Sequence, residues 1–249
     1  MGGPPVSPGL RDVFVLTGAG ISAESGLGTF RDPDGLWRRF DPMRLATPEA
    51  FADAPEEVHA FYNLRRQGAR AAAPNAAHAA LVRLEAGLAA RGGRLFLCTQ
   101  NVDDLHERAG ATAVVHMHGE LMRARCIACG QGLPWAEDLS VETACPACGQ
   151  RGGMRPDVVW FGEMPLHLEA IAQALDTSDL FVAIGTSGAV YPAAGFVARA
   201  RAAGIPTHEI NLAPSDTAGL FAQATYGPAT QAVPDFVDGL LQTIGGPPS

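Results

Sequence analysis

Two pairs of cysteines carry the most specific chemical signal in this sequence. Each pair has the spacing Cys-x-x-Cys, 15 residues separate the pairs, and a glycine follows the second cysteine of each. The four residues are Cys126, Cys129, Cys145 and Cys148. This spacing is typical of tetrahedral zinc, and four thiolates leave no open position for water, so we expect one structural zinc ion. Four buried free thiols are the alternative.

A glycine-rich turn near the start could bind phosphate groups. The apolar run from Val13 to Thr17 leads into Gly18, Ala19 and Gly20. Glycine lets backbone N–H groups approach a pyrophosphate without a Cβ clash. The turn is similar to dinucleotide-binding turns, but the acidic residue that hydride-transfer enzymes need about 20 residues later falls in a loop-like segment. An ordinary tight turn explains the glycines equally well.

Three further polar groups follow apolar runs. Gln100, Asn101 and Asp103 form an amide-rich segment that could contact a ligand, with a generic polar loop as the alternative. His118 is a candidate general base near pH 7, although single histidines are more often structural. Small polar residues at 185–187 and 211 suit ribose and phosphate contacts, but each signal is weak by itself.

The elements that must position these residues alternate between strands and helices. Five short apolar runs predict buried parallel strands: Val13 to Thr17, Arg94 to Thr99, Ala113 to Met117, Leu180 to Ile184 and Thr207 to Asn211. Helices are predicted from the N-cap Asn75 to near Gly92, from Tyr191 to Ala203 and from Asp235 to Ile244. The alternation predicts a Rossmann-like, doubly wound α/β fold with the ligand at the carboxyl ends of the strands.

Two stretches interrupt this alternation and predict a small second lobe. We expect a large lobe of residues 9–31, 75–121 and 154–249, and a small lobe made of a helical insertion, 32–74, and a zinc module, 122–153, all within one catalytic domain spanning 1–249. The cleft between the lobes is then the expected active site.

Composition narrows the partners. The net charge of −8 argues against a nucleic-acid partner and suits a cationic protein substrate. No apolar run reaches the roughly 18 residues of a membrane helix, and the first eight residues do not resemble a secretion signal. We therefore expect a cytoplasmic monomer that contacts no membrane.

Together these motifs resemble the sirtuin family of NAD-dependent protein deacylases, and most closely its bacterial branch. The matching segments are Gly-Ala-Gly-Ile-Ser (18–22), Thr-Phe-Arg (29–31), Gln-Asn-Val-Asp (100–103), His-Gly-Glu-Leu (118–121), the cysteine pairs, Val-Val-Trp-Phe-Gly-Glu (158–163), Gly-Thr-Ser (185–187) and Asn-Leu (211–212). They occur in family order along nearly the whole chain.

The resemblance implies a role for each matching residue. His118 is implied as the catalytic base, with Asn101 and Arg31 as further catalytic residues. The implied NAD-binding residues are Gly18, Ala19, Gly20, Ile21, Glu24, Thr29, Phe30, Arg31, Trp37, Gln100, Asn101, Val102, Asp103, Gly185, Thr186, Ser187, Asn211, Leu212, Ala213 and Ala229. The backbone of Val159, Trp160, Phe161 and Gly162 is implied to pair with the substrate peptide as an added strand. NAD is consumed, and the implied products are nicotinamide, O-acyl-ADP-ribose and deacylated lysine.

One further match narrows the acyl group. Tyr62 and Arg65 match the Tyr-x-x-Arg pattern of sirtuins that remove acidic acyl groups, and Ala46 matches the small residue of that class. On a helix the two side chains share a face and could hold a carboxylate. The resemblance therefore implies desuccinylation and demalonylation beside deacetylation, with an ordinary helix face as the alternative.

Three other functions remain open at the sequence level. Mono-ADP-ribosyl transfer would use the same NAD site, and a non-catalytic module could bind NAD and zinc without releasing nicotinamide. Hydride transfer is the third, and the misplaced acidic residue argues against it.

Overall fold

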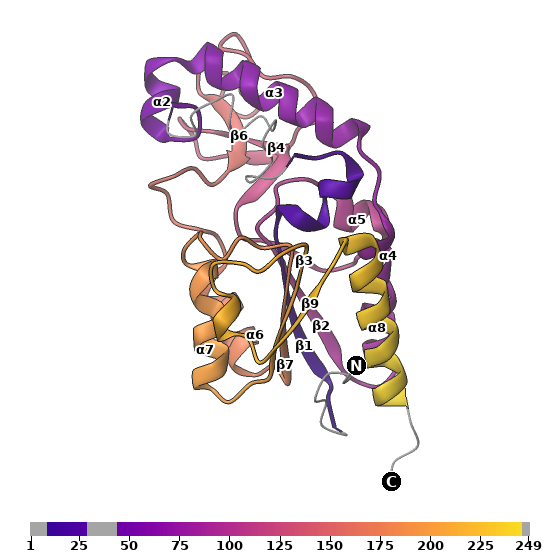
Figure 1. Ribbon diagram of the computed structural model, residues 1–249. Coiled ribbons are helices and arrows are strands. Elements are labelled where there is room, and N and C mark those ends of the chain that lie inside the picture. The colour runs from indigo at the N-terminus through magenta and orange to yellow at the C-terminus, as the bar shows by residue number, and fades with distance from the viewer. Residues whose placement is uncertain (1–8, 29–43, 246–249) are drawn as a thin grey trace.

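A six-stranded parallel sheet forms the centre of the larger lobe. The computed structural model describes residues 9–28 and 44–245 (Figure 1). The sheet order is β3-β2-β1-β7-β8-β9, and every neighbouring pair is parallel. The strands are β1 (Asp12–Thr17), β2 (Arg94–Thr99), β3 (Val114–His116), β7 (Leu180–Ile184), β8 (Thr207–Asn211) and β9 (Gln223–Tyr226). The strand order reverses between β1 and β7, which is where open α/β sheets bind ligands.

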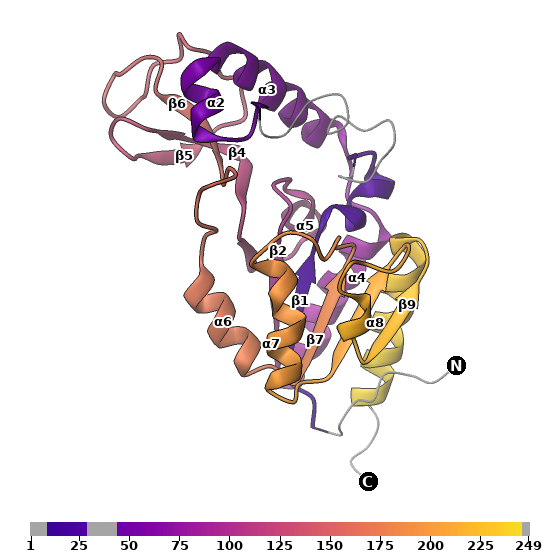
Figure 2. The ribbon, with the colours of Figure 1, turned by 60° about the vertical axis from the view of Figure 1, so that its left-hand side comes forward.

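Helices cover both faces of this sheet, as predicted for a doubly wound fold. Helices α4 (Ala76–Ala89) and α8 (Ala229–Gly245) lie on one face, and α6 (Leu168–Asp176) and α7 (Phe196–Ala202) lie on the other (Figures 1 and 2). Alternate residues of β1 serve the two cores: Val13 and Val15 pack on the first side, Phe14 and Leu16 on the second. This two-sided burial explains why the strand reads as a continuous apolar run.

Most predicted strands are confirmed. The predicted bounds of β2, β7 and β8 are those observed, β1 starts one residue earlier, and β3 is shorter than predicted. Strand β9 was not predicted; it is a four-residue edge strand whose side chains alternate between half-buried and exposed. Such a strand has no apolar run to reveal it.

The predicted helices are confirmed in part. Asn75 is the N-cap of α4, because its side chain accepts the Ala77 N–H. The predicted start of the last helix at Asp235 is wrong: α8 begins at Ala229, where the Glu24 carboxylate accepts the N–H and hydroxyl of Thr230 and so satisfies first-turn donors. The predicted helix from Tyr191 to Ala203 is divided into a 3-10 turn, Ala193–Gly195, and α7, after Pro192.

A second sheet and two helices make up the small lobe above the main sheet (Figure 2). The antiparallel order is β5-β4-β6, formed by Gly132–Pro134, Gly119–Cys126 and Met154–Val158, with α2 (Pro48–Asp53) and α3 (Pro55–Ala71) packed beside it. The predicted lobe boundaries at 121/122 and 153/154 fall within β4 and at the start of β6. Helix α5 (Leu105–Ala109) and 3-10 turns at Ala19–Ile21, Ala23–Ser25 and Ala218–Leu220 complete the described elements.

Among the helices of residues 9–28 and 44–245, none has the length and apolar character needed to cross a membrane.

Candidate active site and metal centre

Two glycine turns interlock at the point where the sheet order reverses. The Gly18 N–H donates to Ile184 O, and the Gly20 N–H donates to Gly185 O, both at 2.9 Å. A Cβ on Gly185 would lie 2.6 Å from the Ile21 nitrogen, and its φ of +63° also favours glycine. The predicted cofactor glycines therefore allow two backbones to approach each other at the end of β1.

The amide of Asn101 is held against this turn. Its Nδ2 donates to Gly18 O at 3.1 Å and to the Ser22 hydroxyl at 3.2 Å, and the residue is buried. Since both N–H groups are engaged, the amide can offer a further ligand only its oxygen. Ser22, which also lies 3.5 Å from His78 Nε2, was not among the predicted site residues.

Asp103 places a buried carboxylate on the same segment. Its Oδ1 accepts the Leu105 N–H at 3.2 Å. Burial raises the pKa of Asp103, while the hydrogen bonds from Leu105 and Ser22 and the nearby His116 act to lower it. The preceding Val102 carbonyl accepts the Leu121 N–H at 2.8 Å, which joins this segment to β4. Such a carboxylate can accept a hydrogen bond from a ribose hydroxyl.

His118 lies beside the same segment in a defined tautomer. Its Nδ1 is 3.0 Å from Gln100 O. A carbonyl oxygen only accepts, so Nδ1 carries the proton and Nε2 holds the free lone pair. Burial lowers the pKa of His118, with the Gln100 hydrogen bond opposing it. The side chain is thus a neutral imidazole suited to general-base chemistry.

His116, two residues earlier, has the opposite charge state. Its Nδ1 is 3.3 Å from Asn101 O and its Nε2 is 2.7 Å from Glu107 Oε1. Both partners accept, so both ring nitrogens carry protons. Burial acts to lower the pKa of His116, but the Glu107 hydrogen bond and charge outweigh it and the pKa lies above its usual value.

The remaining predicted cofactor residues follow β7 and β8. Asn211 Nδ2 donates to Thr186 O at 2.8 Å, which joins the two strand ends, and Ser187 and Ala213 lie in the turns that follow. Leu212 is exposed and Ala229 is the first residue of α8. Glu24 contacts the first turn of α8 through Thr230. The predicted residues Thr29, Phe30, Arg31 and Trp37 lie outside the described part of the chain.

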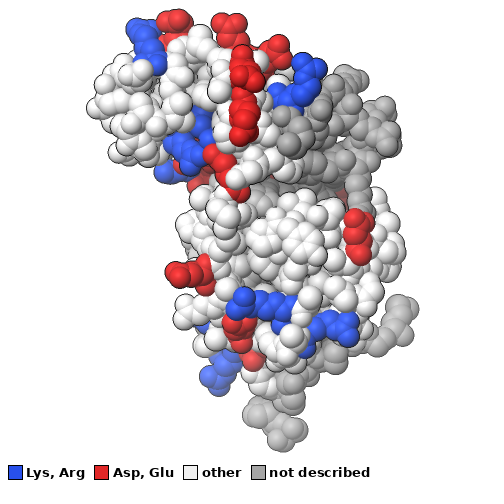
Figure 3. Space-filling model, turned by 90° about the vertical axis from the view of Figure 1, so that its left-hand side faces the viewer, with Lys and Arg blue, Asp and Glu red and all other residues white. Residues whose placement is uncertain are grey.

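The segment predicted to pair with the substrate peptide, 159–162, follows β6 and connects it to the larger lobe. The Val159 N–H donates to His118 O at 2.8 Å, and the Phe161 N–H donates to Ala46 O at 2.9 Å. Phe161 is half exposed, and Gly162 has a φ of +88° in the turn that ends this segment. In Figure 3 charged side chains gather on the small lobe, and much of the surface just below it carries none. Residues 159–161 thus link His118 to the segment that precedes α2.

Tyr62 lies behind this segment on α3. The Trp160 indole N–H donates to its hydroxyl at 3.0 Å, and the Arg65 guanidinium carbon lies 5.5 Å from its ring centre. Burial raises the pKa of Tyr62, whereas Arg65, Trp160 and Arg155 act to lower it. The phenol is therefore neutral at pH 7 and can donate a hydrogen bond. Ala46 packs in the same apolar cluster as Tyr62 and Trp160.

The four predicted zinc ligands form one cluster. Their sulfur atoms all lie within 4.8 Å of one another, and the Cys126–Cys148 and Cys129–Cys145 pairs are each 3.8 Å apart. A tetrahedral site with Zn–S bonds of about 2.3 Å places its sulfurs about 3.8 Å apart. The cluster fits a structural zinc ion that joins the turn after β4 to the turn before β6.

Comparison with known proteins agrees with this arrangement. The Sir2 family model matches residues 18–192. An NAD-dependent protein deacylase of Caulobacter vibrioides is 60% identical, covering 95% of this chain and 99% of that protein. The NAD-dependent protein deacylase of Escherichia coli (strain K12) is 54% identical, covering 93% of this chain and 83% of that protein.

Solved structures give the same result at the level of the fold. A mutant Sir2 homologue in complex with ADP ribose superposes with a TM-score of 0.88 at 36% identity, covering 97% of this chain and 96% of that one. A Sir2 homologue in complex with NAD gives 0.85 at 36% identity, covering 95% and 92%. The interlocked glycine turns, the paired histidines and the cysteine cluster therefore belong to a member of the Sir2, or sirtuin, family.

Proposed function

We propose that this chain removes acyl groups from protein lysine side chains and consumes NAD in doing so. The observation that carries the proposal is the fixed tautomer of His118, whose Nε2 is a neutral base beside the amide-rich segment. The similarity to NAD-dependent protein deacylases from Caulobacter and Escherichia supports the reaction class.

The described residues among those predicted to bind NAD support this proposal. The turns after β1, β7 and β8 meet at the carboxyl edge of the sheet, and Asn101 and Asp103 add an amide oxygen and a carboxylate there. NAD supplies a ribose carbon to which the amide oxygen of the acyl-lysine would bond as nicotinamide leaves. With water, the balanced products are nicotinamide, O-acyl-ADP-ribose and free lysine.

His118 takes a proton in this scheme. Its Nε2 accepts the proton of a ribose hydroxyl, which lets that oxygen attack the acyl carbon, while Nδ1 keeps its hydrogen bond to Gln100 O. Asn101 and Asp103 orient the ribose, and the backbone of 159–162 holds the substrate peptide as an added strand.

The proposal extends to acidic acyl groups. Tyr62 donates from a neutral phenol, and Arg65 supplies a guanidinium that would form a charge-assisted pair with a succinyl or malonyl carboxylate. Ala46 packs in the same apolar cluster as Tyr62, and its small side chain would leave room for a longer acyl chain.

The reaction class is tested with a panel of acyl-lysine peptides, NAD and a nicotinamide-release assay on wild type and His118→Ala. We expect NAD-dependent deacylation that falls by a factor of about 10²–10⁴ in the variant, the usual worth of a general base. Full activity in His118→Ala would remove the proposed role.

The acyl class is tested with Tyr62→Phe and Arg65→Met on acetyl and succinyl versions of one peptide. We expect desuccinylation to fall at least tenfold more than deacetylation, because a hydrogen bond to a charged group contributes about 1.5–3 kcal/mol. Equal losses on both peptides would show that the two residues do not select the acyl group.

The proposal includes the expected setting of the enzyme. The net charge of −8 supports a protein rather than a nucleic-acid partner, and thiols arranged as metal ligands support a reducing, cytoplasmic location. We further propose that the protein is a monomer. Its large lobe would consist of residues 9–31, 75–121 and 154–249, and its small lobe of residues 32–74 and 122–153.

A further inference from the structure

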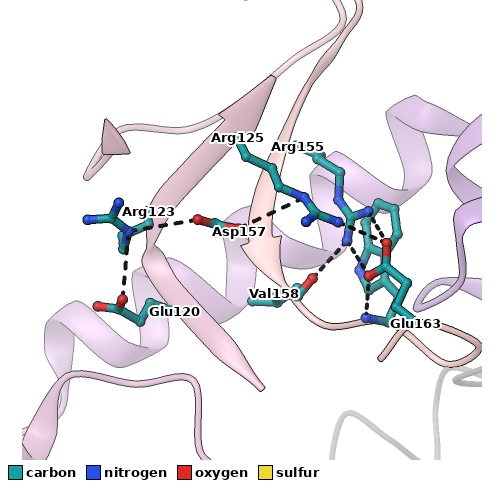
Figure 4. Close-up of polar contacts among 8 residues, drawn as sticks. Glu120, Arg123, Arg125, Arg155, Asp157, Val158 and Glu163 are labelled. Carbon is teal, nitrogen blue, oxygen red and sulfur yellow. Dashed lines mark hydrogen bonds and ion pairs between the residues drawn. The ribbon is translucent and has the colours of Figure 1, made fainter. Parts of the chain in front are cut away.

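A buried arginine forms an ion pair beneath the proposed peptide-binding segment, 159–162. Arg155 Nη1 lies 2.7 Å from Glu163 Oε1 and its Nη2 lies 3.0 Å from Glu163 Oε2, so the contact is bidentate (Figure 4). Only 3% of the Arg155 side chain is exposed. A buried guanidinium is costly unless it is paired and hydrogen-bonded, so this pair is held in one geometry.

The same two side chains fix the backbone of the peptide-binding segment and of Val158, the residue before it. Arg155 Nη2 also donates to Val158 O at 2.7 Å, and Glu163 Oε2 accepts the Trp160 N–H at 2.8 Å. Arg125 adds a contact of 2.9 Å to Glu163 Oε1. The ion pair therefore holds the substrate segment on both sides of Val159.

The ion pair also fixes the indole of Trp160. The Arg155 guanidinium carbon lies 3.2 Å from the ring centre of Trp160, which places the cation directly on the aromatic face. Trp160 is buried, and its indole N–H donates to the Tyr62 hydroxyl at 3.0 Å. Four side chains from β6, the following loop and α3 thus form one continuous chain of contacts.

We propose that Arg155 and Glu163 are positioning residues for acyl-group selection, acting through Trp160 on the Tyr62 hydroxyl. A hydroxyl that accepts the indole N–H keeps its own proton to donate to another acceptor, and the carboxylate of a succinyl or malonyl group is such an acceptor. Arg155 and Glu163 do not touch the acyl group. The inference rests on the proposed function, because it concerns the acyl site of that reaction.

A purely structural role makes a different prediction. If the ion pair only stabilised the small lobe, its loss would reduce deacetylation and desuccinylation by the same factor. If it orients Tyr62, the ratio of the two activities changes, with the effect concentrated in the KM of the succinyl peptide.

The test compares Trp160→Phe, Arg155→Met, Arg155→Lys and Glu163→Gln with wild type. Steady-state kcat and KM are measured with one peptide sequence carrying acetyl-lysine or succinyl-lysine. Arg123→Met is the matched control, because Arg123 lies on the same sheet and contacts Glu120 and Asp157 only at 3.7 and 3.8 Å. We expect the succinyl-to-acetyl ratio of kcat/KM to fall about fivefold in Trp160→Phe, as for the loss of one hydrogen bond.

The other variants grade the effect. Arg155→Met is expected to lower the ratio at least as far as Trp160→Phe, and Arg155→Lys, which keeps a cation but loses the bidentate pair, to an intermediate value. Glu163→Gln lowers the ratio, and Arg123→Met leaves it unchanged. A ratio that stays at the wild-type value in both Trp160→Phe and Glu163→Gln overturns the inference even if Arg155→Met does not fold.

A double-mutant cycle tests the route through Tyr62. In a Tyr62→Phe background, Trp160→Phe should have no further effect on the ratio; an undiminished fivefold effect would overturn the route. Failure of the proposed function is distinguishable: a wild-type protein that releases no nicotinamide contradicts the reaction, and one that deacetylates without desuccinylating contradicts the acyl assignment and this inference with it.

Discussion

At the scale of single residues, His116 and His118 are identical side chains whose pKa values shift in opposite directions. His116 contacts the carbonyl oxygen of Asn101, and His118 contacts the carbonyl oxygen of the preceding residue, Gln100. The difference comes from Glu107, which lies 2.7 Å from His116 Nε2. One carboxylate therefore favours the charged form of His116, whereas His118, which lacks such a partner, is a neutral base.

The neutral state of His118 predicts the pH dependence of the reaction. Burial places the pKa of His118 below its usual value of 6.5. The proposed base is therefore neutral above that pH and becomes protonated only at lower pH. We expect kcat/KM to be flat from pH 8 to 6.5 and to decline below it. A pH–rate profile measures this, and a decline centred above pH 7 would contradict the neutral assignment. The residual activity of His118→Ala should lack this acid limb.

The charge on His116 predicts an effect of Glu107→Gln. Removing the carboxylate lowers the His116 pKa and weakens its hold on the Asn101 carbonyl, so we expect kcat/KM for NAD to fall about tenfold. Glu85→Gln is the control, because Glu85 contacts the exposed Thr112 away from the site. NMR titration of His116 provides an independent readout, and an unchanged His116 titration in Glu107→Gln would show that Glu107 does not set its charge.

At the scale of elements, the site depends on two turns that pack backbone against backbone. Because a Cβ on Gly185 would meet Gly20 and Ile21 at 2.6–2.7 Å, neither turn can move aside without breaking the hydrogen bonds that join β1 to β7. Substitution here affects the placement of both turns at once.

A pair of glycine substitutions tests this packing. Gly185→Ala is expected to lower the free energy of unfolding by at least about 1–3 kcal/mol, from positive φ and backbone overlap. Gly239→Ala, in the interior of α8 with nothing within 4 Å of its Cβ position, should raise it by about 0.5–1 kcal/mol. Urea denaturation measures both, and equal effects would contradict the packing argument.

The sequence predicted buried elements better than contacts between elements. Strands β2, β7 and β8 were predicted to the residue. Two-sided burial makes β7 apolar throughout and β2 apolar between its ends, whereas β8 is buried with Ile210 as its one apolar residue. The four zinc ligands could also be predicted from the sequence, because they lie close together in the chain. The Glu24–Thr230 contact joins residues 206 positions apart, and Trp160–Tyr62 joins residues 98 apart. No local pattern contains such pairs, so the early start of α8 and the support of Tyr62 required the structure.

At the scale of the whole molecule, burial lowers the pKa of five of the described histidines, and it does so most strongly for three of them. Burial lowers the pKa of His59 and of His78 to about 4, and of His106 to about 3. Neither ring nitrogen of His59 has a hydrogen-bond partner among the described residues. In the unfolded chain these groups take up protons near pH 6.5, so acid favours unfolding.

This burial predicts that stability declines between pH 6.5 and 5. Each such histidine lowers the free energy of unfolding by up to about 1.4 kcal/mol per pH unit in that window. His116 acts with the opposite sign, because its raised pKa adds stability below 6.5 that is lost as pH rises through its folded pKa. His59→Phe should reduce the acid slope by one histidine's share. Urea denaturation at pH 8, 6.5 and 5.5 measures it, and an identical slope in the variant would contradict the buried neutral state.

The position of β1 at the centre of the main sheet has a consequence for synthesis of the chain. This strand leaves the ribosome first among the six, but its two neighbours are β2, from residue 94, and β7, from residue 180. The apolar side chains on both faces of β1 therefore remain uncovered until most of the polypeptide has emerged from the ribosome. The turn that follows β1 also contacts Thr230 through Glu24, so this end of the sheet is completed only when nearly the whole chain has been made. Until β2 and β7 have emerged, the unpaired strand is exposed to aggregation and is a candidate for protection by a chaperone.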